Sequence, residues 1–376
     1  MEISERVSLI KRHTADVLGE NEIEGVLKRV SKPRHYIGFE ISGKIHLGTG
    51  IVCMAKVKDM IEAGVRASIF LADWHTWIND KLGGDREVIK RVAVGYFKEG
   101  LKASLLCVGA KPSDVEFVLG SELYHHNDSY WQTVIEVSKH TTLARIKRSI
   151  TIMGRKEGES IDFAKLIYPP MQVADIFSQG IHFPHAGLDQ RKAQVIARDV
   201  ALKLKLSALR DDNGNVIKPI AIHHPLVLGL GKPPIWPVSK ENLQEMLSEL
   251  KMSKSKPDSC VFIHDSPDEI KRKVKNAFCP EGEVGFNPVL DWAKNLVFRL
   301  GRGLEVKRPE KFGGDVSYSS FEKLERDFKE KKLHPADLKS AVAEEIVEIL
   351  RPAREHFSKG APKRALEEFE KIYSRC

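Results

Sequence analysis

The sequence of 376 residues predicts an α/β protein with a Rossmann-like parallel-sheet domain and a helical insertion, followed by a mostly α-helical C-terminal domain. Residues 35–72 have the pattern of a strand, a glycine-rich turn, a helix and a second strand, which is typical of a parallel sheet with a right-handed crossover. A basic, helical stretch without a strand follows at about 121–165. After about residue 262 the pattern is helical only.

The first strand–helix–strand unit contains the turn SGKIHLGTG (42–50), and its helix ends at Gly64. Short apolar runs bounded by turn residues predict strands at HYIGFE (35–40), ASIFLA (67–72), 115–120 and 221–230. Helical patterns predict helices at 51–63, 287–299, 319–331, 335–356 and 362–374. Pro335 suits a first helical turn, and Pro352 is expected to kink or divide its segment.

The change from strands to helices predicts the domain boundaries. Residues 1–262 are expected to form the sheet domain, in which about 121–165 is the insertion and 226–262 carries the sequence KMSKS. Residues 263–376 are expected to form the helical domain.

Composition narrows the class of protein. The formal net charge is +8, which suits a partner rich in phosphate. The chain begins without a signal-type segment and has no apolar run of the ~18 residues that a membrane helix needs, so neither export nor a membrane partner is expected. The five cysteines are widely spaced without a CxxC pair, which excludes a disulfide framework or a zinc ribbon and fits the reducing cytoplasm.

The turn SGKIHLGTG (42–50) suits a phosphorylated ligand. Gly43, Gly48 and Gly50 leave the backbone bare where the first helix begins, and His46 adds an imidazole beside that helix start. The turn is not GxGxxG, and LGLGK at 228–232 is not a Walker A loop because a proline follows it. The composition of KMSKS (251–255), taken alone, favours a solvated loop.

A polar stripe lies on an otherwise apolar helix in YPPMQVADIFSQG. Tyr168, Gln172 and Asp175 are spaced to share one helical face, while their neighbours are apolar nearly all round. The prolines at 169 and 170 predict that Tyr168 stands at or just before the helix start. Polar groups on a buried helix need partners, so this face is a candidate binding surface.

HLGT (46–49) and KMSKS (251–255), in this order, resemble the two signature motifs of class I aminoacyl-tRNA synthetases. The resemblance implies a loop that closes over the ATP triphosphate and stabilises the leaving pyrophosphate. It implies catalytic roles for His46, Thr49, Lys251 and Lys254, and ATP contacts by Gly48, Asp189, Met252, Ser253 and Ser255. Family members usually carry His where this chain has Thr49, whose hydroxyl can still donate to phosphate.

Tyr36, the polar stripe and GLDQRK (187–192) resemble tyrosyl-tRNA synthetases of the archaeal and eukaryotic type. The resemblance implies ATP-dependent activation of L-tyrosine to tyrosyl-adenylate, followed by transfer to the 3′ end of tRNA(Tyr). ATP would act with Mg²⁺, and no protein-bound metal is expected. The residues expected to bind tyrosine are Tyr36, Tyr168, Gln172, Asp175 and Gln190, and those expected to line the pocket are Glu40, Ala72 and His75.

KFGGD (311–315) and LHPADLK (333–339) match the anticodon-reading segments of the same family. The resemblance implies tRNA contacts by Arg148, Arg191, Lys192, Phe312, His334 and Asp337, and a cytoplasmic homodimer. Ordinary turn and helix capping is the alternative for the last three residues. A tryptophanyl-tRNA synthetase, a nucleotidyltransferase for a small cofactor and a catalytically silent RNA-binding relative remain the alternative functions.

Overall fold

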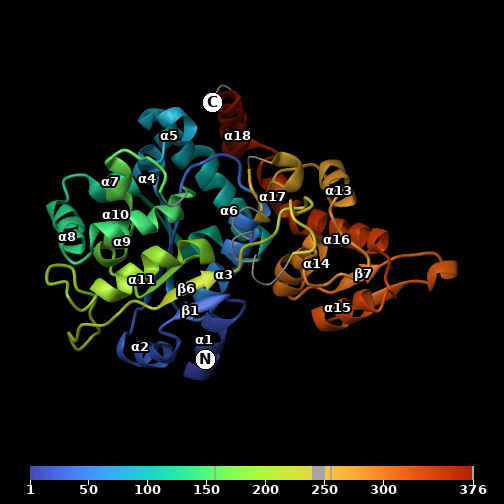
Figure 1. The fold of residues 1–376 in the computed structure, drawn as a ribbon, viewed down its shortest axis with the longest axis horizontal. Helices are drawn as coiled ribbons and strands as arrows, with labels where there is room; N and C mark the ends of the chain where they lie inside the picture. The colour runs from blue at the N-terminus through green and yellow to red at the C-terminus, as the bar shows by residue number, and fades with distance from the viewer. Residues whose placement is uncertain (156–157, 239–249, 255, 375–376) are drawn as a thin grey trace.

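The computed structural model describes residues 1–155, 158–238, 250–254 and 256–374. Within these residues a six-stranded sheet has the order β1-β6-β5-β2-β3-β4 (Figure 1). The strands are β1 (Asp16–Leu18), β2 (Arg34–Phe39), β3 (Arg66–Leu71), β4 (Val115–Leu119), β5 (Phe183–Gly187) and β6 (Ala221–His224). Every neighbouring pair is parallel except the β1–β6 pair at the edge. The predicted α/β class is therefore confirmed.

Helices cover both faces of this sheet. They are α1 (Ile3–Lys11), α2 (Ile23–Arg29), α3 (Cys53–Glu62), α4 (Asp73–Ile78), α5 (Arg86–Val92), α6 (Lys98–Cys107), α7 (Gly120–Tyr124), α8 (Asp128–Lys139), α9 (Leu143–Ser149), α10 (Ala164–Ser178) and α11 (Arg191–Val200). Successive residues of a strand point to opposite faces, so Ile37 and Ile69 join one apolar core while Tyr36 and Phe70 join another. A sheet buried on both faces is typical of parallel α/β proteins.

The C-terminal region is mostly helical. Its elements are α13 (Pro267–Lys275), α14 (Pro288–Trp292), a short hairpin of β7 (Leu304–Val306) and β8 (Val316–Tyr318), α15 (Phe321–Lys329), α16 (Pro335–Ile349), α17 (Arg351–His356) and α18 (Gly360–Tyr373). The helix predicted at 335–356 is divided between α16 and α17, next to Pro352, as expected. Neither α13 nor the hairpin was predicted.

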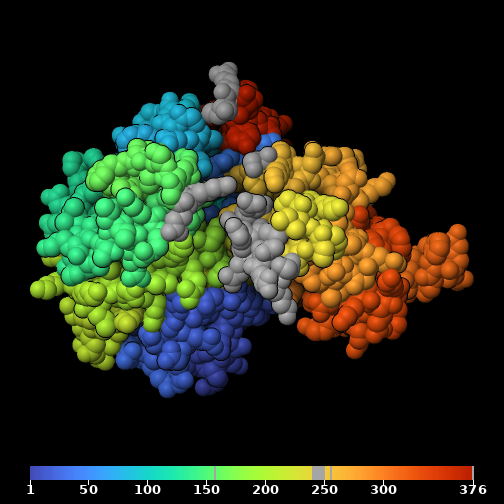
Figure 2. Space-filling model, viewed as in Figure 1, coloured from blue at the N-terminus to red at the C-terminus, as the bar shows by residue number. Residues whose placement is uncertain are grey.

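The last two helices return to the sheet region. The rings of Tyr96 and Phe369 stack with their centroids 4.1 Å apart, and Phe357 also lies against Tyr96. Figure 2 shows the C-terminal residues gathered on one side of the molecule, with the red α18 segment extending back over the sheet region. A single apolar core therefore runs from the sheet into the C-terminal helices.

Two strand predictions need correction. The strand expected at 221–230 ends at His224, because Pro225 follows and has no N–H for a strand ladder. Strand β5 was missed because it contains Pro184 and has no alternating pattern, although all its residues are buried. The edge strand β1 was missed because it has only three residues. The described part of 121–165 contains helices and turns without a strand, as predicted.

The helix that carries the polar stripe also differs from the prediction. Helix α10 begins at Ala164, so Tyr168 lies inside it and the prediction of a helix start there is wrong. The helix continues through Pro169 and Pro170, although each lacks the N–H that would bond to the carbonyl four residues earlier. Tyr168, Gln172 and Asp175 still lie along one side of the cavity, because all three belong to the same helix.

Candidate active site

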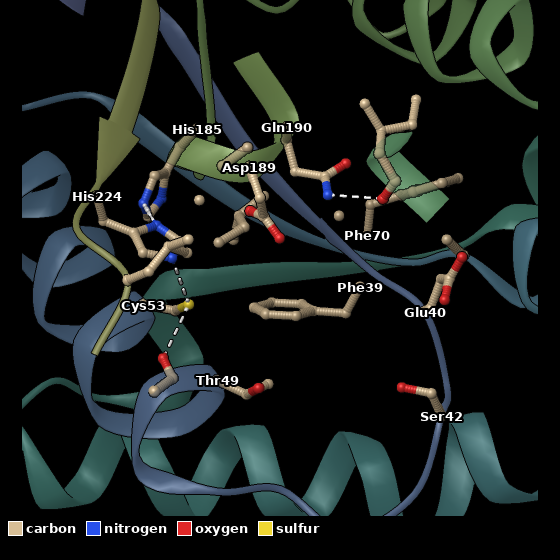
Figure 3. Close-up of a pocket in the computed structure, with 18 of the residues that line it drawn as sticks. Phe39, Glu40, Ser42, Thr49, Cys53, Phe70, His185, Asp189, Gln190 and His224 are labelled. Carbon is tan, nitrogen blue, oxygen red and sulfur yellow. Dashed lines mark hydrogen bonds between the residues drawn. The ribbon is translucent and has the colours of Figure 1, made fainter. Parts of the chain in front are cut away.

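A cavity of about 310 Å³ opens at the carboxyl ends of β2, β5 and β6 (Figure 3). Strands β3 and β4 lie on one side of β2, whereas β5 and β6 lie on the other. After β2 the chain adds strands on one side of it, and from β5 onward it adds them on the other side. The boundary between β2 and β5 is therefore a topological switch point, which is where parallel α/β sheets bind ligands. The cavity brings together every residue predicted to bind tyrosine and the predicted pocket residues Glu40, Ala72 and His75.

Asp175 lies at the closed end of this cavity and is almost fully buried. The hydroxyls of Tyr124 and Tyr130 donate to its Oδ1 atom at 2.9 and 3.1 Å. Its Oδ2 atom lies 3.6 Å from Nε2 of His75. Burial raises the pKa of Asp175 to about 8, although the two tyrosine hydrogen bonds act in the opposite direction.

Two further buried polar groups, His75 and Tyr36, lie beside Asp175. Nε2 of His75 has no hydrogen-bond partner within the described residues, and burial lowers the pKa of His75 to about 3, so its imidazole is neutral. The Tyr36 ring is buried next to Phe70, and burial with the nearby Asp175 raises the pKa of its hydroxyl. A ligand hydroxyl at this end would meet an acceptor and donors together.

A second polar group lies farther along the cavity. The Tyr168 hydroxyl donates to Oε1 of Glu40 at 2.8 Å, and the Asn79 amide donates to the same oxygen at 2.9 Å. Nε2 of Gln172 donates to Oε1 of Gln190 at 3.3 Å. Oε1 of Gln172 is buried without a hydrogen-bond partner in the described part of the chain. This oxygen is an acceptor of the kind that an ammonium group needs.

The HLGT sequence forms the start of the helix that continues into α3. A π-helical turn spans Gly48–Val52, and the hydroxyl of Thr49 lies 3.2 Å from Nε2 of His46. A side chain at Gly50 would come within 2.7 Å of the Ser104 hydroxyl, so only glycine fits there. Burial, together with the nearby Lys254 and Lys251, lowers the pKa of His46 to about 3.

The KMSKS segment supplies two cations to the open end. The Lys251 ammonium donates to Asp189 at 2.7 Å, and the Lys254 ammonium donates to the Ser42 hydroxyl at 2.8 Å. Burial lowers the pKa of Lys254 to about 8, while the neighbouring Glu40 raises it. Met252 also lines the cavity, whereas Ser253 does not. Ser255 lies outside the described residues.

Three predicted tRNA residues gather on the outside of the sheet region. Arg148, Arg191 and Lys192 are exposed, and the Lys192 ammonium donates to the backbone carbonyl of Arg148 at 2.9 Å. Arg191 forms an ion pair with Asp16 at 3.0 Å. The structure therefore brings the end of α9 and the start of α11 together.

The other three residues predicted to contact tRNA lie in the C-terminal region. The Phe312 ring is 62% exposed on the turn between β7 and β8, with the Lys311 ammonium 4.9 Å from its centroid. Nδ1 of His334 accepts the Ala336 N–H at 3.1 Å, so His334 caps helix α16. Asp337 stands in the first turn of that helix. The capping alternative for His334 is thus present in the structure, and its tRNA role stays a prediction.

The sequence analysis did not predict the buried side chains that form hydrogen bonds to the residues lining the cavity. Tyr124 and Tyr130 stand 51 and 45 residues before Asp175, and no local pattern connected them with it. A line of hydrogen bonds also runs from His35 through His185 and His224 to Cys53, with 2.8 Å between His185 Nε2 and His224 Nδ1. Figure 3 shows the part of this line from His185 through His224 to Cys53, beside Thr49. Of these histidines, only His224 stood out in the sequence, as a member of an adjacent pair.

Neither a metal cluster nor a membrane span is found within the described ranges. No group of three or more His, Cys, Asp or Glu side chains there is arranged to hold a metal ion. The helices described in this structure include none that is both long and apolar enough to cross a membrane.

Comparison with known proteins identifies the family. The family of class I tRNA synthetases (W and Y) matches residues 28–351. The chain is 58% identical to a tyrosine–tRNA ligase of Thermococcus sibiricus over 362 residues, which are 96% of each chain. The chain belongs to the class I tRNA synthetases of the tyrosine type. It is therefore an aminoacyl-tRNA synthetase, and the predicted family is confirmed.

Solved structures of this family have the same fold. The tyrosyl-tRNA synthetase of Pyrococcus horikoshii, solved with L-tyrosine, superposes with a TM-score of 0.95 at 54% identity, over 99% of this chain and 100% of the other. The enzyme of Aeropyrum pernix gives a TM-score of 0.82 at 40% identity, over 99% and 100% of the two chains. A tryptophanyl-tRNA synthetase of Aeropyrum pernix, at 17% identity and a TM-score of 0.64, shares the fold alone.

Proposed function

We propose that this synthetase is a tyrosine–tRNA ligase, which activates L-tyrosine with ATP and transfers it to the 3′ end of tRNA(Tyr). The observation that carries the proposal is the closed end of the cavity, where Oδ2 of the buried Asp175 lies 3.6 Å from Nε2 of His75, with the Tyr36 hydroxyl nearby. The chain's similarity to the Pyrococcus horikoshii structure, which contains L-tyrosine, supports the choice of this amino acid.

The closed end selects the phenol hydroxyl. The cavity is also lined by Phe70 and Ala72, which belong to the same apolar core as Tyr36 and suit an aromatic ring. The substrate hydroxyl donates to Asp175 and accepts from Tyr36. Phenylalanine would leave these buried groups unpaired, which is how sites of this kind reject it. Tyrosyl-tRNA synthetases are themselves the standard example of this effect, with a discrimination of about 10⁵ that was measured in the family rather than calculated from this structure.

The amino and carboxylate groups of tyrosine point toward the open end. The ammonium donates to the unpartnered oxygen of Gln172 and to the Tyr168 hydroxyl, near the carboxylate of Glu40. The amide of Gln190 lies within reach of Gln172 and orients this part of the substrate. The tyrosine carboxylate is then directed toward the site of ATP.

Activation needs no protein nucleophile. A tyrosine carboxylate oxygen forms a bond to the α-phosphorus of ATP, the bond to the bridging oxygen breaks, and that oxygen leaves with pyrophosphate. ATP enters as its Mg²⁺ complex. Lys251 and Lys254 stabilise the charge that develops on pyrophosphate, while the helix start at Gly48 and the neutral His46 and Thr49 hold the phosphates. Asp189, now paired with Lys251, is proposed to contact the ribose.

Transfer takes place on the tRNA bound across both regions. A ribose hydroxyl of the terminal nucleotide attacks the acyl carbon of tyrosyl-adenylate, and AMP leaves. Arg148, Arg191 and Lys192 contact the acceptor end. The exposed Phe312 ring stacks on an anticodon base, while His334 and Asp337 bond to base edges, which is how single-stranded RNA is read.

We further propose that the enzyme works as a homodimer in the cytoplasm. The inserted helices are proposed to form the interface, and Ile135 on α8 and Leu143 on α9 expose 61% and 60% of their surfaces. Light scattering after size exclusion tests this, and a monomer that remains fully active contradicts it.

Amino-acid-dependent exchange of pyrophosphate into ATP, run across all twenty amino acids, tests the first step. We expect exchange with tyrosine and none above background with tryptophan or phenylalanine. Exchange with tryptophan alone would establish the rival synthetase, and exchange that needs no amino acid would favour a nucleotidyltransferase. A protein that binds tRNA without any exchange would be the silent relative.

Charging of tRNA tests the second step. The variant Asp337→Ala should keep tyrosine-dependent exchange but raise the KM for tRNA and blur selection at one anticodon position. The loss of one base contact is expected to cost about 1–3 kcal/mol, the range for a good bidentate pair in duplex readout. The matched variant Lys192→Ala should weaken all anticodon variants alike. Unchanged charging of every anticodon variant by Asp337→Ala would make this helix start purely structural.

A further inference from the structure

A second cavity, separate from the active site, surrounds the buried side chain of Arg299. This cavity of about 260 Å³ shares no lining residue with the first one. Arg299 stands in a short 3₁₀ turn (Phe298–Leu300) of the C-terminal region. The opposite wall belongs to the sheet region and includes Arg12, His13 and Lys58.

Arg299 is 7% exposed and has no partner for its charge among the described residues. Its Nε, Nη1 and Nη2 atoms make no hydrogen bond to any residue that the structure describes. Burial lowers the pKa of Arg299 to about 10, so the guanidinium remains cationic at neutral pH. A buried, unpaired charge is strongly destabilising, and buried arginines in proteins are normally paired.

The surroundings of Arg299 are also cationic. Arg12 pairs with Asp59 and Glu62, Lys58 pairs with Glu62, and the buried Lys56 pairs with Asp59. These three cations and Arg299 thus share only two carboxylates. Burial, followed by the nearby Arg299, lowers the pKa of His13 to about 4, so His13 is a neutral hydrogen-bonding group. The cavity therefore holds an excess of positive charge and unused N–H donors.

We propose that this cavity binds a phosphate group, which pairs with the Arg299 guanidinium. The planar fork of N–H donors matches two phosphate oxygens at once. A phosphate carries one to two negative charges, and the residues that line the cavity include three cations, Arg12, Lys58 and Arg299, against two carboxylates, Asp59 and Glu62. Arg12 and Lys58 at the mouth of the cavity supply the remaining contacts, because both are partly exposed.

The phosphate has two sources with the same chemistry. One is free inorganic phosphate or pyrophosphate, and the other is a backbone phosphate of bound tRNA. The phosphate site does not depend on the chemistry of the first cavity, so it can be tested separately from the proposed reaction. It would connect the C-terminal region with the sheet region, because its walls come from both.

Inorganic phosphate is the probe that tests the site. The full-length parent and the variant Arg299→Met are melted in sodium phosphate and in sodium chloride of equal ionic strength, which removes general screening. The control is Arg302→Met, whose exposed guanidinium pairs with Glu345 outside the cavity. A ligand that binds only the folded state raises Tm. Titration calorimetry measures the affinity directly.

We expect phosphate to raise the Tm of the parent and of Arg302→Met but not of Arg299→Met. The phosphate affinity of Arg299→Met should fall on the order of 10- to 100-fold, the loss expected when a charged hydrogen-bond partner is removed. An equal response of all three proteins, or no response in any of them, overturns the proposal. An equal response would place the ion elsewhere, including the first cavity.

A second variant keeps the test decisive if Arg299→Met does not fold. Lys58 lies on the cavity wall and is 37% exposed, so Lys58→Met should fold and bind phosphate several-fold more weakly than Arg302→Met. Identical phosphate affinities of these two variants would then overturn the proposal.

Binding of tRNA distinguishes the two sources. If the phosphate belongs to tRNA, Arg299→Met weakens tRNA binding, inorganic phosphate competes with tRNA, and the slope of affinity against salt falls by about one. If the phosphate is free, tRNA affinity is the same in parent and variant while the Tm response to inorganic phosphate is still lost. Either result supports the site and identifies its ligand.

Discussion

The two ends of the active-site cavity are built in different ways. At the closed end, one oxygen of Asp175 is held by two buried tyrosine hydroxyls, and the groups that face the ligand are already in place. At the open end, Lys251 and Lys254 are held by Asp189 and Ser42, which are partners that a triphosphate can replace. The closed end is preorganised around one ligand group, whereas the cations of the open end have to exchange partners.

This difference is expected to separate the groups that determine tyrosine affinity from the groups that determine the rate of activation. Groups that contact tyrosine equally in the ground state and the transition state determine its affinity, whereas groups that meet charge only as pyrophosphate leaves determine the speed of activation. Substitutions at the closed end should therefore change tyrosine binding, and substitutions at the open end should change the activation rate. The predictions that follow test that separation.

Lys254→Ala should have the largest effect. Removing one cation from the leaving group is expected to slow adenylate formation by roughly 10²–10³-fold while tyrosine affinity stays the same, since losses of this size follow removal of single oxyanion donors. Rapid-quench measurement of the activation step tests this. Lys256→Ala is the control, because Lys256 is exposed and does not line the cavity. A loss of tyrosine affinity without a loss of rate would erase the distinction between the two ends.

Asp175→Ala should have the next largest effect. It leaves the substrate hydroxyl and the Tyr124 and Tyr130 hydroxyls without an acceptor, and we expect tyrosine affinity to fall roughly 10- to 100-fold, with a lower Tm. Phenylalanine affinity should change much less, because phenylalanine makes no hydrogen bond there. Equilibrium dialysis with both amino acids measures the difference. Equal losses for the two ligands would mean that Asp175 acts only as a structural residue.

The pH dependence of tyrosine binding should show a smaller effect. Oδ1 of Asp175 already accepts from two tyrosine hydroxyls, so the proton of a neutral Asp175 would lie on Oδ2 and compete with donation by the phenol. The pKa of this carboxyl is raised to about 8 in the unliganded protein. Affinity should therefore rise roughly tenfold from pH 7 to pH 9, in proportion to the ionised fraction. The same titration of tyrosine binding in Asp175→Asn corrects for ionisation of the ligand's own amine and phenol, because the ligand is the same. In Asp175→Asn the rise should disappear, and a pH-independent parent would contradict the assignment.

Tyr130→Phe should have the smallest effect. The hydroxyl of Tyr130 lowers the pKa of Asp175, so its loss should move the midpoint of the binding curve to higher pH and weaken tyrosine binding a few-fold at neutral pH. Adenylate formation at saturating tyrosine should not change. Tyr318→Phe is the control, because Tyr318 is a buried tyrosine of the C-terminal region. A midpoint that shifts to lower pH would show that the carboxyl is stabilised in some other way.

Sequence patterns predicted the parts of the site that are local in the chain. HLGT follows the first strand, the stripe of α10 repeats with the helical period, and each can be recognised within about ten residues. The sheet class followed from the first strand–helix–strand unit for the same reason. Strand β5 was not predicted because its proline and its buried histidine are not typical of a buried strand, although it forms one wall of the cavity.

The sequence by itself determined the family, the fold class and the order in which the two signature motifs occur. Only the tertiary structure decided that Tyr124 and Tyr130 hold Asp175, that Lys251 meets Asp189, and that Arg299 is buried without a partner among the described residues. The physical reason is that a side chain's identity sets what it can bind, whereas its burial and its partners depend on packing between distant segments. Burial and the available partners together set the pKa of Asp175 and leave the charge of Arg299 without a partner among the described residues.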